Sequence, residues 1–189
     1  MKRNNMISII MTFSLMLNIS CMTSDGSFKN NNNAHSTDRM ARNKTIHNMA
    51  ANGDIEGIKK ELAKGVDVNL AEPNFGFTPL MNAVIGKRAD VAEFLLKRGA
   101  KINKPDQAGM TALAWSVNHD SLECFRLLIR KKAKVEAKDS ILGKTPLLNA
   151  VSANNPEYAR TLIAHRANVY AKTKNGETTL LLAISNSHY

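Results

Sequence analysis

The sequence predicts an all-α solenoid, in which each repeat has two short helices and a β-hairpin loop. We expect four full repeats and a C-terminal half repeat. The first observation is a pattern, Gly-x-Thr-x-Leu, that occurs four times. Its threonines, spaced by 33, 34 and 33 residues, are Thr78, Thr111, Thr145 and Thr178. The second is the helical spacing of apolar residues after each threonine. Both observations are typical of a stacked-repeat architecture.

The N-terminal segment is typical of a secretory signal peptide. Two cations, Lys2 and Arg3, precede an apolar stretch over residues 6–19, and the small Ser20 follows it. That stretch is shorter than the ~20 apolar residues of a membrane-spanning helix. We therefore expect residues 1–20 to be absent from the mature protein.

The end of this segment, Ile19-Ser20-Cys21, resembles a bacterial lipoprotein signal. In such signals the cysteine becomes the lipidated first residue of the mature chain. The resemblance implies a lipid on Cys21 and an exported, membrane-anchored protein that faces the periplasm or the cell surface. The alternative is an ordinary signal peptide with a cysteine near its cleavage site, which would give a soluble periplasmic or secreted protein.

Residues 21–42 predict a disordered tether between the lipidated cysteine and the folded part. The segment is rich in Ser, Asn and Thr, with asparagine at every position from 30 to 33, and it shows no apolar period. A composition that cannot bury a core stays disordered. The reach of such a tether grows roughly as the square root of its length.

Each repeat is expected to begin at the threonine of the pattern. Thr78 suits the N-cap of a first helix, and Pro79 suits its first position, where the missing N–H has no cost. A second helix follows over residues 90–96, and Gly99 ends it in a conformation of positive φ. An extended hairpin then leads to the next glycine and threonine.

These residues resemble the ankyrin repeat. The opening Gly76-Phe77-Thr78-Pro79-Leu80 and the endings over residues 65–69 and 99–103 carry the resemblance. It covers about residues 42–189, so we assign 43–189 to an ankyrin-repeat domain. It also implies that His47, at the histidine position of the motif, makes structural hydrogen bonds.

The copies differ in ways that predict their roles. The first, 44–69, has polar Lys60 and Glu61 where later copies are apolar, as suits a terminal cap facing water. Lys132 and Arg166 replace the helix-ending glycine in the third and fourth copies, so we expect less relaxed turns there. The full copies span about 44–69, 72–103, 106–136 and 139–170, and the half repeat begins at 178.

Neither catalysis nor a cofactor is expected. Gly143-Lys144-Thr145 resembles the end of a phosphate-binding loop, but Lys138 stands where that loop needs a glycine. The five histidines are too far apart for paired metal ligands, so we expect no metal site. Cys124 lies within a helical pattern and is interpreted as a small buried apolar group. No nucleophile or acid–base pair stands out, so the catalytic residues are expected to be none.

In ankyrin proteins the hairpin tips and the concave face of the first helices bind partners, so the resemblance implies a protein-binding module. Two tips are one residue longer than the others and place a large apolar residue before the turn glycine. An exposed apolar stripe along the tips would mark an interaction site. The alternative is that these side chains fold back and only pack the array. The predicted protein-binding residues are Phe75, Phe77, Met110, Ile141 and Leu142 at the tips, and Ile85, Asn118, His119 and Ser152 on the concave face.

The formal net charge of +10 belongs mainly to the repeats, because the signal segment contributes only two cations. Basic residues near the repeat ends, such as 97–98 and 130–134, could steer an acidic partner or approach anionic lipid. The simpler interpretation is a solvated helix-end face. We expect no nucleic-acid binding, since no aromatic pattern accompanies the charges.

The sequence thus favours a monomeric, lipid-anchored protein that binds an unidentified protein partner, and its basic charge suits an acidic one. The alternatives are a soluble modulator of an enzyme and, with less support, an enzyme.

Overall fold

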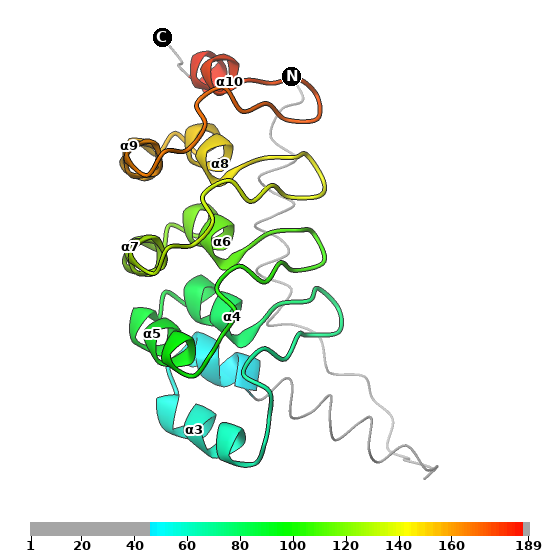
Figure 1. Ribbon diagram of the computed structural model, residues 1–189, viewed down its shortest axis with the longest axis vertical. Helices are drawn as coiled ribbons and strands as arrows, with labels where there is room; N and C mark the ends of the chain where they lie inside the picture. Colours follow the sequence, from blue (N-terminus) through cyan, green and yellow to red (C-terminus); the bar gives the residue numbers. More distant parts are fainter. Residues whose placement is uncertain (1–45, 187–189) are drawn as a thin grey trace, which may run out of the picture. The chain divides into compact units, whose positions relative to one another are not determined.

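The structure, a computed structural model, describes residues 46–186. The expected signal peptide, the tether and Cys21 lie outside these residues. The described part is a stack of helix pairs, which confirms the all-α solenoid (Figure 1). Residues 46–52 form the first helix of the first repeat. The helices that follow are α3 (Ile55–Ala63), α4 (Pro79–Ile85), α5 (Ala89–Lys97), α6 (Ala112–Asn118), α7 (Leu122–Arg130), α8 (Pro146–Ser152), α9 (Pro156–Ala164) and α10 (Thr179–Asn186).

The first helices α4, α6, α8 and α10 form one row, and the second helices α5, α7 and α9 form another beside it (Figure 1). A hairpin loop projects sideways before each of these first helices. Backbone hydrogen bonds close the loops, for example from Glu72 N to Phe77 O at 2.8 Å and from Asp139 N to Lys144 O at 3.0 Å. Within residues 46–186 the loops form no extended strand, only a single bridge between Lys172 and Thr178.

The threonines begin the first helices, as predicted. The hydroxyl oxygens of Thr78 and Thr145 each accept a hydrogen bond at 3.3 Å from a backbone N–H three residues later. A proline follows each of them at the first helical position. These caps satisfy backbone donors that the helix itself leaves unpaired.

The core lies between the two rows of helices. Leu80, Leu113 and Leu147, the leucines of the first three copies of the pattern, are fully buried. Phe125 of α7 and Tyr158 of α9 meet edge to face with ring centroids 4.6 Å apart. Cys124 is buried and unpaired, which confirms its interpretation as a small core side chain.

Two sets of hydrogen bonds hold consecutive repeats in register. One joins neighbouring hairpins, with Ser140 N donating to Ala108 O at 2.8 Å and Lys174 N to Leu142 O at 2.8 Å. The other, which we call the loop ladder, joins the loops after the second helices. In each of its three rungs a side-chain oxygen accepts from a backbone N–H of the next repeat. The rungs are Asn69 to Lys101 (2.6 Å), Asn103 to Lys134 (2.8 Å) and Glu136 to Asn168 (2.9 Å).

The turn after each second helix has a left-handed backbone. Gly65 and Gly99 occupy it in the first two repeats, with φ of 86° and 91°. Lys132 and Arg166 occupy it in the next two, with φ of 61° and 66°. The expectation of less relaxed turns is confirmed, because a side chain in this region meets its own backbone.

Lys132→Gly is therefore expected to raise the free energy of unfolding, by about 1 kcal/mol, because glycine adopts positive φ without the Cβ penalty. Urea denaturation measures the change. Lys134→Gly is the matched control, since Lys134 has no positive φ. That variant should lose stability, because glycine adds conformational freedom to the unfolded chain. Equal changes in both variants would contradict the strain assigned to Lys132.

α10 packs against α8 with one side only. On its other side Leu180 and Ile184 are 70% and 62% exposed. No helix within residues 46–186 is both long and apolar enough to cross a membrane.

Candidate partner-binding surface

Four rings from two repeats form a continuous surface feature, which we call the aromatic row: Phe75, Phe77, Trp115 and His119. Phe75 and Phe77 belong to the hairpin before α4, Trp115 lies on α6, and His119 directly follows α6. The centroids of consecutive rings are 5.6, 5.1 and 5.4 Å apart. Phe75 is 37% exposed and the other three are half-buried, so the row presents ring surface to solvent.

Hydrogen bonds fix both sides of the central contact. The indole Nε1–H of Trp115 donates to Asp106 Oδ2 at 2.8 Å, and Asp106 Oδ1 accepts from Met110 N at 2.8 Å. The buried Asp106 carboxylate thus joins the α6 ring to its own hairpin. His47 Nε2 lies 2.9 Å from Phe77 O and 3.0 Å from Leu70 O. Carbonyls only accept, so Nε2 carries the hydrogen, and the structural role expected for His47 is confirmed.

Trp115 is the member of the row that the sequence prediction missed. Two signals could have found it. It takes the position held by Asn48, Asn82 and Asn149 in the other full repeats. It also stands four residues before His119, a spacing that places two side chains on one face of a helix.

Of the predicted tip residues, only Phe75 and Phe77 join the row. Ile141 is 67% exposed on a more distant hairpin, whereas Met110 and Leu142 are half-buried. Asp139 folds the longer tip back, because its carboxylate accepts from the backbone N–H groups of residues 141, 142 and 144. The apolar residues therefore form separate exposed spots along the tips and no continuous stripe.

The predicted concave-face residues occupy equivalent places in three repeats. Ile85, Asn118 and Ser152 each end a first helix, α4, α6 and α8. Asn118 is exposed, while Ile85 and Ser152 are half-buried. Ser152 Oγ accepts a hydrogen bond from Lys144 Nζ at 3.2 Å. Asn118 directly precedes His119 of the aromatic row, and Ile85 and Ser152 end the two helices that pack against α6, α4 and α8.

Burial lowers the pKa of His119 below its ordinary value of 6.5, and the nearby cation of Lys87 lowers it further. Both effects disfavour the charged imidazolium. The imidazole is therefore neutral at pH 7, and the aromatic row has no charge of its own. Such a surface suits apolar and aromatic groups.

Acidification is expected to destabilise the wild-type protein more than a His119→Asn variant. The folded-state pKa of His119 is depressed, so below about pH 6.5 the unfolded chain binds the proton more readily and stability falls with pH. Thermal melts of both proteins at about pH 7 and about pH 5 measure the difference. If both proteins lost the same thermal stability on acidification, the pKa of His119 would not differ between the folded and unfolded states.

Neither a metal centre nor an activated thiol lies in the part of the chain that the structure describes. Residues 46–186 contain no group of three His, Cys, Asp or Glu side chains placed to hold a metal ion. Burial raises the pKa of the Cys124 thiol above its usual range, which leaves little of the reactive thiolate.

Comparison with known proteins gives the same architecture. Residues 46–139 match the family described as ankyrin repeats (3 copies), and residues 147–189 match ankyrin repeats (many copies). Inversin of Gallus gallus is 34% identical over 122 residues, which cover 65% of this chain and 11% of that protein.

Two further relatives have similar identities. Ankyrin repeat and SOCS box protein 6 of Homo sapiens is 33% identical over 132 residues, covering 65% of this chain and 31% of that protein. A putative ankyrin repeat protein of Rickettsia felis is 31% identical over 123 residues, covering 65% and 40%. The chain thus spans less than half the length of each relative. Since the two family matches lie on the stacked helix pairs, the chain belongs to the ankyrin-repeat family.

Proposed function

We propose that this protein binds another protein through the aromatic row and the neighbouring ends of the first helices. The observation that carries the proposal is the unbroken series of ring contacts from Phe75 to His119, which remains partly open to solvent. Aromatic side chains bury a large area for few rotatable bonds and dominate the energetics of many interfaces.

The scaffold beneath the row favours this use. Asp106 orients Trp115, and backbone bonds between hairpins hold Phe75 in place, with Gln107 N donating to Phe75 O at 3.0 Å. A preorganised surface loses less conformational entropy when a partner arrives. A role in packing alone would account for Phe77, which contacts the core. It would not account for Phe75, whose ring is exposed.

Site-specific crosslinking tests the proposal. A photoreactive phenylalanine at position 75 is expected to crosslink one partner from the native source, and the same residue at position 163 is expected not to. Ile163 is a matched control because it is also an exposed apolar residue, 48% accessible, on α9. Equal crosslinking from both positions would reject the aromatic row as the binding surface.

Substitutions supply an independent readout with the captured partner. Phe75→Ser should weaken binding by about tenfold or more, as truncation of an interface anchor does. Ile163→Ser should leave binding within about twofold. Thermal melts of both variants separate a lost contact from a lost fold. Unchanged affinity in a folded Phe75→Ser protein would overturn the proposal.

We also propose that the protein is exported and held at a membrane by a lipid on Cys21, with residues 21–42 as the tether. The charged start, the apolar stretch and the cysteine after Ser20 support this. The alternative is a soluble periplasmic or secreted protein that modulates an enzyme. Cys21→Ala should move the protein from the membrane to the soluble fraction, and continued membrane association would rule out the lipid anchor.

A further inference from the structure

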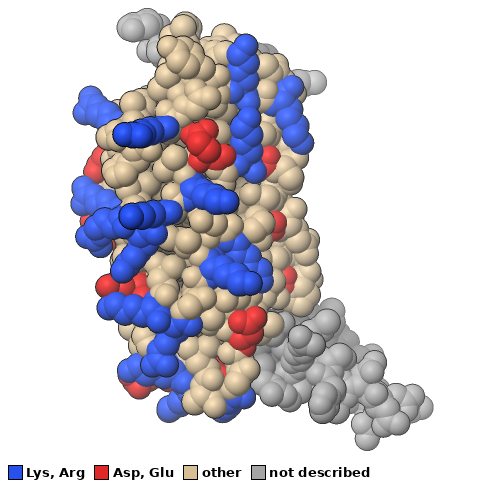
Figure 2. Space-filling view, viewed as in Figure 1, with Lys and Arg blue, Asp and Glu red and all other residues tan. Residues whose placement is uncertain are grey.

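A second surface lies on the loops that follow the second helices α5, α7 and α9. Six exposed cations gather there over three consecutive repeats, and we call them the basic ridge. They are Arg98, Lys101, Lys131, Lys132, Lys134 and Arg166. Figure 2 shows blue Lys and Arg side chains along the face viewed, with few red carboxylates between them.

Carboxylates offset the charge of the ridge only in part, since Glu136 lies in the same loops and Glu93 interacts with Lys131. Within the residues that the structure describes, the ion pairs involve Lys59, Lys64, Lys97 and Arg126, and none of the six ridge cations. Arg98 lies over the ring of Phe94, with 5.0 Å from Cζ to the ring centroid.

The ridge has a definite beginning. In the first repeat the equivalent cation Lys64 is paired with Glu61 at 2.7 Å, and the acidic Asp67 stands where Lys101 and Lys134 stand later. The six ridge cations therefore lie on repeats two to four, while the equivalent positions of the first repeat hold an ion-paired lysine and an aspartate.

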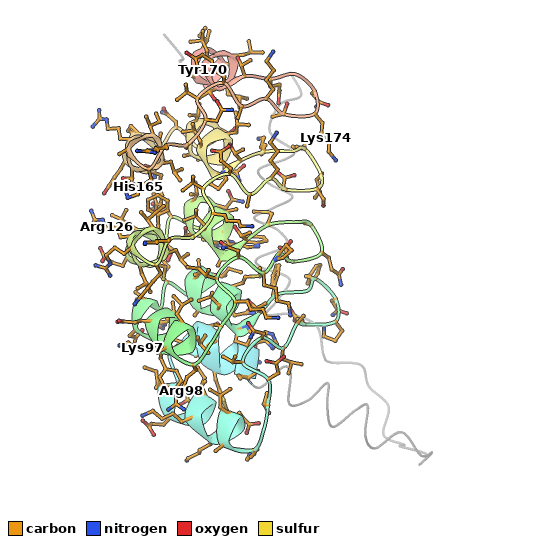
Figure 3. All side chains as sticks on the ribbon, viewed as in Figure 1. Lys97, Arg98, Arg126, His165, Tyr170 and Lys174 are labelled. Atoms are coloured by element: carbon orange, nitrogen blue, oxygen red, sulfur yellow. The ribbon has the colours of Figure 1, made fainter. Side chains whose placement is uncertain are left out.

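The loop ladder sets the spacing of the ridge. Its rungs at Lys101 N, Lys134 N and Asn168 N hold the three loops in register. Figure 3 labels Arg98 after α5 and His165 after α9, which mark the loops at the two ends of this run. Neighbouring helices pack roughly 8–10 Å apart, so the cations of successive loops recur at about that interval.

Two ridge cations are kept at a conformational cost. Lys132 and Arg166 have positive φ at the position that glycine fills in the first two repeats. The favourable field of a helix C-terminus explains cations in the last helical turn, but it fades beyond that turn and does not reach Lys134. Positive φ is found at this turn in all four repeats, so the cost falls on the side chains that replace glycine.

We infer that the basic ridge binds an extended acidic segment of a protein. A segment in the polyproline II conformation rises ~3.1 Å per residue with three residues per turn, so every third side chain lies on the same side and would meet the cations of the next repeat. Three loops would accommodate roughly seven residues of such a segment. This surface lies on other loops than the aromatic row and does not depend on it.

Two other polyanions could be attracted by these cations. One is an anionic bilayer, which the competition experiment below separates from a peptide. Single-stranded nucleic acid is bound by successive aromatic side chains that stack on its bases. The ridge offers one exposed ring near its end, Tyr170, and no such series.

The test measures binding of the full chain to a fluorescein-labelled peptide in which glutamate recurs at every third position between serines and glycines. Fluorescence anisotropy should show binding that weakens as NaCl is added. A peptide of the same composition with contiguous glutamates should bind about threefold more weakly or worse, because fewer carboxylates reach the cations. Equal binding of the two peptides would overturn the spacing argument.

Charge-matched variants locate the site. Lys132→Gln with Arg166→Gln should weaken binding about fivefold, as the loss of two exposed ion pairs predicts. Lys60→Gln with Arg160→Gln removes the same charge from exposed positions away from the ridge and should change binding less than about twofold. If both double variants lost affinity for the peptide equally, net charge alone would attract the peptide, and the assignment of the site to the ridge would be overturned.

Competition decides the class of partner. Vesicles containing phosphatidylserine and a single-stranded oligonucleotide are each added to the peptide complex. At equal concentration of charge, neither competitor should displace the bound peptide. The inference would be overturned if one competitor displaced the peptide and no longer bound the Lys132→Gln, Arg166→Gln double variant. The ridge would then be a binding site for vesicles or for the oligonucleotide.

Discussion

Phe125→Ala is expected to lower the free energy of unfolding by about 3–5 kcal/mol, as the loss of a large buried ring usually does. Phe125 is fully buried in α7 and packs edge to face against Tyr158 of the next repeat. The variant removes this inter-repeat contact and leaves a cavity between α7 and α9. Urea denaturation measures the loss.

The matched control is Phe94→Ala, which truncates a half-buried phenylalanine in the preceding second helix. It should cost about 1–2 kcal/mol, because less apolar surface returns to water. Stability in a repeat stack is shared between neighbours, so amide exchange in Phe125→Ala should rise most in α7 to α9. An equal cost for both variants would contradict the assigned role of Phe125.

Gly86→Ala is expected to destabilise the protein by about 3 kcal/mol or more, at the upper end of overpacking effects. A Cβ at Gly86 would lie 2.2 Å from Ala51 O and 2.9 Å from Ala51 Cα and C. These are backbone atoms of the first helix and cannot rotate away. The first repeat should therefore separate from the second, which limited proteolysis within residues 46–70 would detect.

Gly99→Ala provides the comparison. No atom lies within 4 Å of a Cβ at Gly99, although its φ is +91°. That variant should cost about 1 kcal/mol from backbone conformation alone. If it proved as damaging as Gly86→Ala, the close approach of the two first helices would not be the cause.

Most of the fold could be predicted because the pattern residues act locally. Thr78 and Thr145 cap helices through contacts three residues away, and the apolar spacing after them reports which side is buried. Departures from the repeat pattern were also informative: Lys132 and Arg166 replace glycine, and both have positive φ. Because the same helix caps and apolar spacing recur in each repeat, the structure of one repeat predicts the structure of the next.

The candidate site was harder to predict because its contacts join distant residues. Phe77 and Trp115 are 38 positions apart in the chain and meet only when hairpin and helix are stacked. For the same reason the exposure of Leu142 was not evident, since it depends on how Asp139 folds the tip. Periodicity identifies equivalent positions, but it does not tell which side chains bridge two repeats.

The loop ladder has one more consequence, for how such a protein can change over evolutionary time. Each rung ends on a main-chain N–H, so the bond does not depend on which side chain that residue carries. Lysine stands at the first two such positions and asparagine at the third, yet all three rungs form. Substitutions at these donor positions can therefore add or remove surface charge in one repeat at a time, while the hydrogen bonds between the loops are kept.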